Sequence, residues 1–275
     1  MPIGAANVPV SQTVKQDILV PTYFDPRYGE SFEELKKALG SDEITLGELL
    51  DMGLITARGG HGSPSNDVRV GTIPYIKVSD IRSLRVNVNP TNMIPRSLAE
   101  KFWRGKESGL KAWDLITPNR ASNNIGEFAI LLPGEEQVVL TKEMFVIRVS
   151  ASGAELFEPF YLHWALSLKA VRNQWRRIAL MQTNREDVGA RYREIRIPWP
   201  THADSPQVWT DEHSKDFKAY FEGIAKAKTT FLSSLQKEGV EFIGGVFSDS
   251  GAGGDGETDA GEKEELKGPA TDEVA

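Results

Sequence analysis

Residues 172–200 read RNQWRRIALMQTNREDVGARYREIRIPWP. Seven arginines gather in this stretch, the uncharged polar run Gln-Thr-Asn at 182–184 interrupts them, and the apolar run Ile-Pro-Trp-Pro ends it at 197–200. The pattern passes from a basic helix through a polar break to a short strand closed by prolines. This mixture favours an α+β fold and raises the question of what the arginines bind.

The composition bounds the class of protein. At 275 residues and 40% hydrophobic content, the chain is long enough for one large domain or two small ones. It has no cysteine, which excludes disulfides, thiolate nucleophiles and cysteine zinc sites, and its four histidines are scattered. No run of about 18 apolar residues and no leader-like segment occurs. We therefore expect a soluble, cytoplasmic protein with no membrane segment, metal or cofactor.

The negative charge is concentrated at the C-terminal end. Residues 246–275 carry nine Asp or Glu and two Lys, which leaves 30 acidic and 30 basic residues over positions 1–245. A Gly-, Ala- and Glu-rich tract of this kind cannot bury enough apolar surface to offset its chain entropy. We expect a disordered tail, either a solubilising segment or a DNA mimic that shields a basic site.

Capping and turn signals divide the N-terminal half. The segment 31–40 is typical of a helix with Ser31 as N-cap, Glu34 as capping-box partner and Gly40 at its end. A short helix capped by Thr45 follows within 44–53, and 58–67 is a Gly-, Ser- and Pro-rich loop. Residues 71–81 then favour a strand in which Pro74 suits an edge position.

Further strands and two longer helices complete the pattern. The strand candidates are 112–119, 127–133, 137–150 and 194–200. Helical spacing predicts one helix over 159–178, and a second, amphipathic helix over about 211–238. The expected architecture is α+β, with a mixed or antiparallel sheet and flanking helices, followed by one long helix and the acidic tail.

No catalytic motif stands out. The chain has no glycine-rich turn for a nucleotide or adenosylmethionine, no phosphate loop after Gly59–Gly62, and no paired acidic motif of a metal-dependent nuclease. His61 could act as a base, but no partner for it is identifiable, so a loop or contact role is favoured. The sequence predicts a protein that is not an enzyme.

Features that suit nucleic-acid binding are more prominent. Residues 163–197 hold eight Lys or Arg against three Asp or Glu, interleaved with Trp164, Trp175 and Tyr192. Basic side chains neutralise phosphates, whereas Gln, Asn and Arg can form paired hydrogen bonds with adenine and guanine. The segment ITPNRASNNIG at 116–126 carries the same residue types. The alternative for each is a solvated helix face or an Asn-rich turn.

The order of these motifs resembles a target-recognition domain of the DNA specificity subunits of type I restriction-modification systems. The matching positions are Leu46-Gly47, Gly71 to Ile76, Asp114 to Thr117 with Ile125-Gly126, Tyr161-Leu162, and Ile197 to Pro200. The resemblance covers roughly residues 18–238.

The resemblance implies a noncatalytic, sequence-specific DNA-binding protein that directs a separate adenine methyltransferase and recognises one half of a bipartite site per chain. The candidate DNA-contacting residues are Arg58, Lys77, Asn119, Arg120, Asn123, Asn124, Arg172, Arg176, Arg177, Gln182, Asn184 and Arg185. The candidate dimer or partner interface is the apolar stripe Phe217, Phe221, Ile224, Phe231 and Leu235. The implied partners are double-stranded DNA, a methyltransferase subunit, a second copy of the chain and a restriction subunit.

Two departures from the family pattern keep an alternative open. A full specificity subunit has two recognition domains and two helices, whereas this chain has one of each, and THADSPQVWTDEH at 201–213 replaces the family's usual Glu-Gln helix entry. The expected organisation is a flexible 1–17, a recognition domain at 18–205, the long helix at 206–245 and a disordered tail at 246–275. The alternative function is a regulatory or protein-interaction component, a decoy or adaptor that kept the fold.

Overall fold

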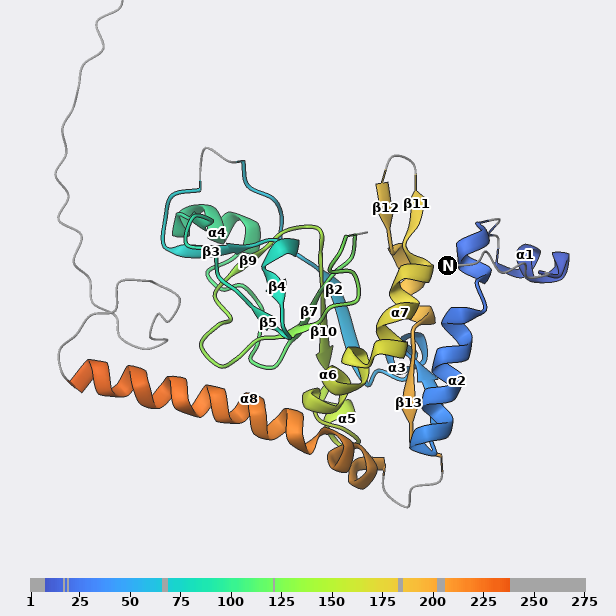
Figure 1. Ribbon diagram of the computed structural model, residues 1–275. Coiled ribbons are helices and arrows are strands. Elements are labelled where there is room, and N and C mark those ends of the chain that lie inside the picture. The colour runs from blue at the N-terminus through green and yellow to red at the C-terminus, as the bar shows by residue number, and fades with distance from the viewer. Residues whose placement is uncertain are drawn as a thin grey trace, which may run out of the picture.

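The computed structural model describes residues 8–16, 18, 20–65, 69–120, 122–182, 185–201 and 206–237 (Figure 1). It has an α+β fold. The elements of the first half are α1 (Val10–Gln16), η1 (Pro21–Phe24), α2 (Arg27–Leu39), β1 (Asp42–Thr45), α3 (Leu46–Asp51), β2 (Ile55–Gly59), β3 (Ile73–Ile76), η3 (Val78–Asp80), β4 (Ile81–Arg82), β5 (Arg85–Val86), β6 (Met93–Ile94) and α4 (Arg96–Trp103).

Short strands and then helices make up the second half. They are β7 (Leu115–Pro118), β8 (Ala129–Ile130), β9 (Val139–Leu140), β10 (Met144–Val149), α5 (Ala151–Ala154), α6 (Pro159–Ser167), α7 (Lys169–Ile178), β11 (Leu180–Gln182), β12 (Arg185–Asp187), η4 (Gly189–Glu194), β13 (Arg196–Trp199) and α8 (Pro206–Lys237).

The central sheet is antiparallel and has the strand order β2-β10-β7-β8. A second sheet has the order β6-β3-β9, in which β3 pairs with β6 antiparallel and with β9 parallel. Three two-stranded pairs, β1-β13, β4-β5 and β11-β12, complete the described strands. The central sheet is therefore antiparallel and the second sheet mixed, and both types are within the sequence-based expectation.

Both faces of the central sheet are buried. Along β10, Phe145 and Ile147 face the largest apolar cluster, which also holds α6 and α7, whereas Met144 and Val146 face a second cluster. This alternation follows from the period of two in a strand. The helical side of the sheet carries the larger core and fixes where α7 and the hairpin β11-β12 emerge.

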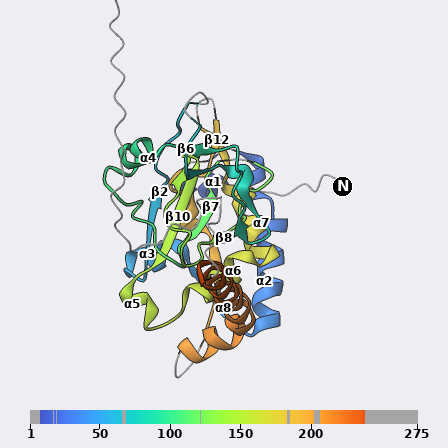
Figure 2. The ribbon, with the colours of Figure 1, turned by 90° about the vertical axis from the view of Figure 1, so that its left-hand side faces the viewer.

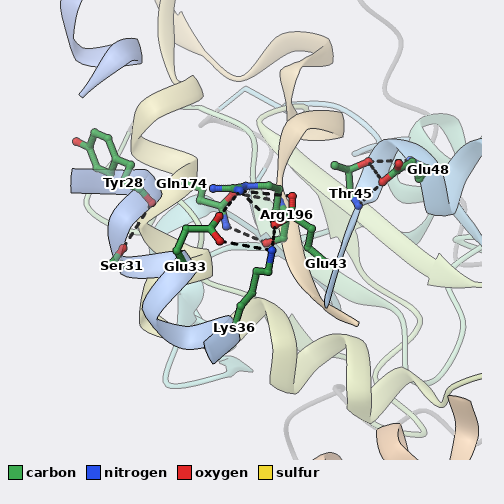
Figure 3. A network of polar contacts seen from close by, with 9 residues as sticks. All are labelled: Tyr28, Ser31, Glu33, Lys36, Glu43, Thr45, Glu48, Gln174 and Arg196. Atoms are coloured by element: carbon green, nitrogen blue, oxygen red, sulfur yellow. Dashed lines mark hydrogen bonds and ion pairs between the residues drawn. The ribbon is translucent and has the colours of Figure 1, made fainter. Parts of the chain in front are cut away.

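Two helix boundaries match the capping signals. The side chain of Thr45 accepts a hydrogen bond from the Glu48 amide in a full capping box, and Gly40 adopts a left-handed φ of 61° at the end of α2. Figure 3 shows the reciprocal Thr45–Glu48 contact. Next to this cap, Leu46 N donates to Ile195 O at 2.9 Å, which anchors α3 to the start of β13.

Some boundaries differ from the sequence-based expectation. Ser31 is not an N-cap: α2 begins at Arg27, and the Ser31 hydroxyl donates back to the Tyr28 carbonyl inside the helix. The single helix expected over 159–178 is two, because Leu168 has an extended ψ of 134° between α6 and α7. The expected strand 137–150 is also two strands, β9 and β10, and α8 begins at Pro206 instead of near 211.

The edge position expected for Pro74 is wrong, because β3 is the middle strand of its sheet. Pro74 is paired with Met93 of β6, whereas the pairing with β9 begins one residue later, at Tyr75. Since the two ladders are offset, the missing amide of proline falls where only one side of the strand is paired. The expected loop 58–67 likewise begins two residues late, because β2 extends to Gly59.

The long helix α8 runs beside the body (Figure 1) and is seen nearly end-on in the second view (Figure 2). Its first half packs on α6, where Phe217 and Phe221 contact His163. Further along, Lys228 forms an ion pair of 2.7 Å with the buried Glu135, and burial lowers the pKa of Lys228. Among the described residues, no helix combines the length and apolarity that crossing a membrane requires.

Candidate nucleic-acid interface

Two polar segments far apart in the sequence meet at one end of the central sheet. Asn119 lies just after β7. Its backbone carbonyl accepts a hydrogen bond from Val188 N at 3.0 Å, and its backbone N–H donates to Glu143 O at 2.9 Å. Val188 directly follows the hairpin β11-β12. The loop that carries Asn119 and Arg120 is therefore fixed against the base of the hairpin.

The hairpin projects from the body (Figure 1). Its register pairs Gln182 with Arg185 next to the turn, so these two predicted DNA contacts are cross-strand neighbours. The third predicted contact, Asn184, lies outside the described residues. The structure thus unites Asn119, Arg120 and the hairpin positions at one end of the molecule.

The asparagines after Arg120 differ in accessibility. Asn123 is exposed, whereas Asn124 is 8% exposed and its Nδ2 donates to the carbonyls of Val78 and Ile81. Its side-chain amide holds the turn before β4, and the DNA contact expected for Asn124 stays a prediction. Arg120 is partly exposed and ion-paired with Glu143.

The predicted residues Arg58 and Lys77 lie on other elements. Arg58 at the end of β2 is half-buried, and its Nη2 donates to Ser108 O at 3.3 Å. Lys77 follows β3 and stands 6.0 Å from the centre of the Tyr75 ring. Lys77 therefore belongs with the turn around Asn124, whereas Arg58 adjoins Gly59 near the hairpin base.

Most arginines of the 172–200 stretch hold the fold together. Arg172 pairs with Glu127 at 2.8 Å. The other described ion pairs are Arg177–Glu194 at 3.9 Å, Arg191–Glu194 at 2.6 Å, Arg193–Asp51 at 2.7 Å, and Arg196 with Glu33 and Glu43 at 2.9 and 3.2 Å (Figure 3). Arg176 is exposed and has no ion-pair partner in the part of the chain that the structure describes. It is the best placed of these side chains to contact a phosphate.

Arg177 takes part in a cluster that the sequence did not reveal. Its guanidinium lies 4.9 Å from the ring centre of Tyr23, Arg191 lies 5.4 Å from the same ring, and the Tyr23 hydroxyl donates to Glu194. Burial, with the hydrogen bond to Glu194, raises the pKa of Tyr23 to about 12. The cluster ties η1 to α7 and η4, so Arg177 stabilises the base of the hairpin. No local pattern could signal it, since Tyr23 and Glu194 are 171 positions apart.

A pocket of about 290 Å³ lies at the base of the hairpin. Its lining comes from five segments of the chain: Gly59, Asn119, Phe145, Trp175, Val188, Gly189 and Tyr192. Of these, the sequence marked Asn119 as a DNA contact and Trp175 and Tyr192 as aromatic neighbours of the arginines. Phe145 was missed, because an aromatic residue in a strand is ordinarily core.

The histidine considered as a base has both ring nitrogens engaged. His61 Nε2 lies 2.9 Å from Ser108 O, and Nδ1 accepts from Leu140 N at 3.0 Å. Burial lowers the pKa of His61 to about 4. Across the described residues, no group of three or more acidic, His or Cys side chains could hold a metal ion. His61 therefore links β2 to β9 as a structural residue.

The stripe expected as a partner interface is divided between core and surface. Phe221 is fully buried in its own chain, and Phe217 and Ile224 pack against the same core. Within its own chain Phe221 is covered by α6, and its interface role stays a prediction. Phe231, at 54% exposure, and Leu235 lie beyond the part of α8 that packs on α6.

Comparison with solved structures finds similarity to two type I specificity subunits and to one type IIG endonuclease. The HsdS subunit from Thermoanaerobacter tengcongensis is 14% identical, with a TM-score of 0.39 over 78% of this chain and 47% of that one. The type I restriction-modification S subunit from M. genitalium is 13% identical, with a TM-score of 0.39 over 80% of this chain and 50% of that one. The type IIG restriction endonuclease BpuSI is 12% identical, with a TM-score of 0.47 over 76% of this chain and 30% of that one.

The chain spans about half the length of the two subunits that it matches. No protein-family model and no curated protein matches the sequence.

Proposed function

We propose that this chain is a noncatalytic DNA-recognition protein that directs a separate adenine methyltransferase to one half of a bipartite site. The observation that carries the proposal is the hydrogen bond from Val188 N to Asn119 O, which joins the polar loop to the base of the hairpin. Residues with the chemistry of base reading and phosphate binding thereby share one end of the molecule.

The division of labour follows from residue type and position. Asn119, Gln182 and Arg185 would contact base edges, because amides pair with adenine and guanidinium groups with guanine. Arg176 would contact a phosphate, since its exposed side chain has no ion-pair partner among the described residues. Arg177 would act indirectly, by holding the hairpin base through Tyr23.

The long helix would provide the contact with a partner. Tyr220 and Phe231 are each 54% exposed on α8, and eleven residues apart they fall on nearly the same side of a helix. We propose that this surface docks a second copy of the chain or the methyltransferase subunit, in the cytoplasm, with a restriction subunit as a further member of the complex. Within this proposal, 18–205 forms the recognition unit and α8 the docking helix, whose expected range of 206–245 runs past Lys237, beyond the described residues. Of the segment 1–17 that was expected to be flexible, Val10–Gln16 form α1, and 1–7 and 17 lie outside the described residues. The proposed acidic tail, 246–275, lies outside the described residues.

The test is a selection from random duplexes, with and without the candidate methyltransferase, followed by titration at two salt concentrations. Arg176→Ala should weaken all duplexes alike and reduce the salt slope by about one unit, as loss of one phosphate contact does. Gln182→Ala should cost roughly 1–3 kcal/mol on the selected site only. The matched variant Arg177→Ala should lower the melting temperature, which Arg176→Ala should not. Absence of DNA retention by the protein and by the complex would refute the proposal.

The second candidate function, a protein-binding adaptor or decoy, is favoured by the exposed aromatic side chains of α8 alone. It predicts a stable protein complex that forms equally well when Arg176, Gln182 and Arg185 are replaced by alanine. The DNA-recognition function predicts that those replacements abolish sequence choice and leave the α8 contact intact.

A further inference from the structure

The pocket at the hairpin base has aromatic walls and a mouth without side chains. The rings of Phe145 and Tyr192 have their centres 4.3 Å apart with an interplanar angle of 54°. Gly59 and Gly189, both exposed, contribute only backbone to the lining. The volume of about 290 Å³ lies just below the range for small-molecule sites, roughly 300–1,000 Å³. It suits one planar ring system.

Two polar atoms in this region are buried without a partner. Trp175, a residue of the pocket lining, has its Nε1 buried without a hydrogen-bond partner among the described residues, and so has Thr117 its Oγ1. Thr117 and Gly59 are the cross-strand neighbours of Phe145 on either side, so the Thr117 and Phe145 side chains project from the same face of the sheet. Buried polar groups in folded proteins usually have a hydrogen-bond partner, and a bound water or ligand can supply one.

We propose that this pocket receives a single nucleobase, with its ring against Phe145 and Tyr192 and an acceptor atom toward the Trp175 N–H. Every base offers a flat face for an aromatic side chain and a ring nitrogen or carbonyl for an N–H donor. The side-chain amide of Asn119, whose Nδ2 donates to Lys142 O at 3.5 Å, keeps a second N–H and its carbonyl oxygen for the base edge. Arg120, next in sequence to Asn119, is partly exposed and ion-paired with Glu143, and its positive charge would face an attached phosphate.

The base could be extruded from a DNA duplex or belong to a free nucleoside. In extrusion, a base leaves the duplex stack and enters a fitted pocket that reads its edge. This source of the base rests on the proposed function. A free nucleoside would bind without DNA. The shared chemistry is that of the base, and the two sources are separated by the arms of one experiment.

In the DNA arm, duplexes from the selection carry 5-iodouracil at one position at a time and are irradiated in the complex. A base stacked on an aromatic side chain should cross-link to Tyr192 or Phe145, which peptide mass spectrometry identifies. In the nucleoside arm, adenosine and thymidine are titrated by calorimetry. Tyr192→Leu should lower the cross-linking yield or the nucleoside affinity, whichever the wild type shows, by about tenfold, as expected when a stacking face is lost. Tyr28→Leu, which changes a tyrosine on α2 outside the pocket, should not.

Trp175→Phe keeps an aromatic wall and removes the N–H, so it should also weaken binding by about tenfold because the base acceptor is left unpaired. If this variant fails to fold, the comparison of Tyr192→Leu with Tyr28→Leu remains decisive. DNA retention without any pocket cross-link or nucleoside binding would overturn the base pocket and leave DNA recognition standing. Nucleoside binding without DNA retention would uphold the pocket and refute the proposed function. Failure of both arms and of retention would refute both.

Discussion

The hydroxyl of Tyr161 on α6 donates a hydrogen bond to the backbone carbonyl of Pro198 in β13, and both residues are buried. This contact joins two of the motif positions through which the sequence resembles a recognition domain. Leu46 and Gly47, another such pair, lie against the segment that leads into the same strand: a Cβ on Gly47 would meet Arg193 O at 2.9 Å. These motif residues are therefore packing contacts of the fold.

Tyr161→Phe should destabilise the protein by about 1–2 kcal/mol, because it leaves the buried Pro198 carbonyl unpaired while the ring still fills its site. Urea unfolding measures this difference. The matched change Tyr28→Phe removes the hydroxyl of a half-exposed tyrosine and should have no effect. Equal stabilities for the two variants would show that the Tyr161 bond adds nothing.

Gly126→Ala should cost about 3 kcal/mol. Gly126 has a φ of 76°, and an added Cβ would lie 3.0 Å from the Arg172 carbonyl and from Trp175 on α7. The control is Gly134→Ala, at a φ of 85° with open space around it, which should cost only about 1 kcal/mol for the left-handed backbone. The difference between the two melting temperatures isolates the contact with α7, and no difference would contradict that contact.

His163 should make stability depend on pH. Burial lowers the pKa of His163 from 6.5 to about 4, and its ring contacts Phe217 and Phe221 on α8. Because the unfolded chain binds the proton first, the stabilisation is complete above pH 6.5 and is lost as the pH falls toward 4. The full loss is roughly 3 kcal/mol, from about 1.4 kcal/mol per pKa unit.

The measurement is the free energy of unfolding by denaturant of the wild type and of His163→Phe between pH 7.5 and 4. This range spans the pKa of histidine in the unfolded chain and that of His163 in the fold. The variant should lose less stability on acidification, while His61, whose pKa is also near 4, contributes equally to both proteins. Parallel pH profiles for the two proteins would contradict a buried, neutral His163.

The two aromatic residues Phe221 and Phe231 of α8 should respond oppositely to the same change. Phe221→Asp buries a charge in the core and should cost at least about 4 kcal/mol. Phe231 lies on the surface, so Phe231→Asp should change the free energy of unfolding by less than about 0.5 kcal/mol. If α8 docks a partner, only Phe231→Asp should yield a folded protein with reduced self-association or methyltransferase binding, measured by light scattering. A folded Phe221→Asp variant would refute the packing of α8 on α6.

Local patterns in the sequence were sufficient for several features. The α+β class, the cap at Thr45, the left-handed end at Gly40 and the strand at 196–199 all follow from short-range chemistry. The boundary errors are of the same local origin: Ser31 offers a capping hydroxyl, but the preceding turn is already helical and begins α2 at Arg27. Similarly, the apolar spacing of 159–178 continues through Leu168 although the backbone does not.

By itself, the sequence indicated where most helices and strands lie and the caps at Thr45 and Gly40, and it identified the arginine-rich stretch as unusual. Only the tertiary structure decided what those arginines do. Arg172, Arg193 and Arg196 are held by carboxylates from distant segments, whereas Arg176 faces solvent. The same holds for Phe221, which a helical stripe cannot distinguish from a surface residue until α6 covers it. The physical reason is that the sequence pattern of a helix or strand shows which of its faces is apolar or charged. The groups that bury that face or pair with its charges come from elsewhere in the chain.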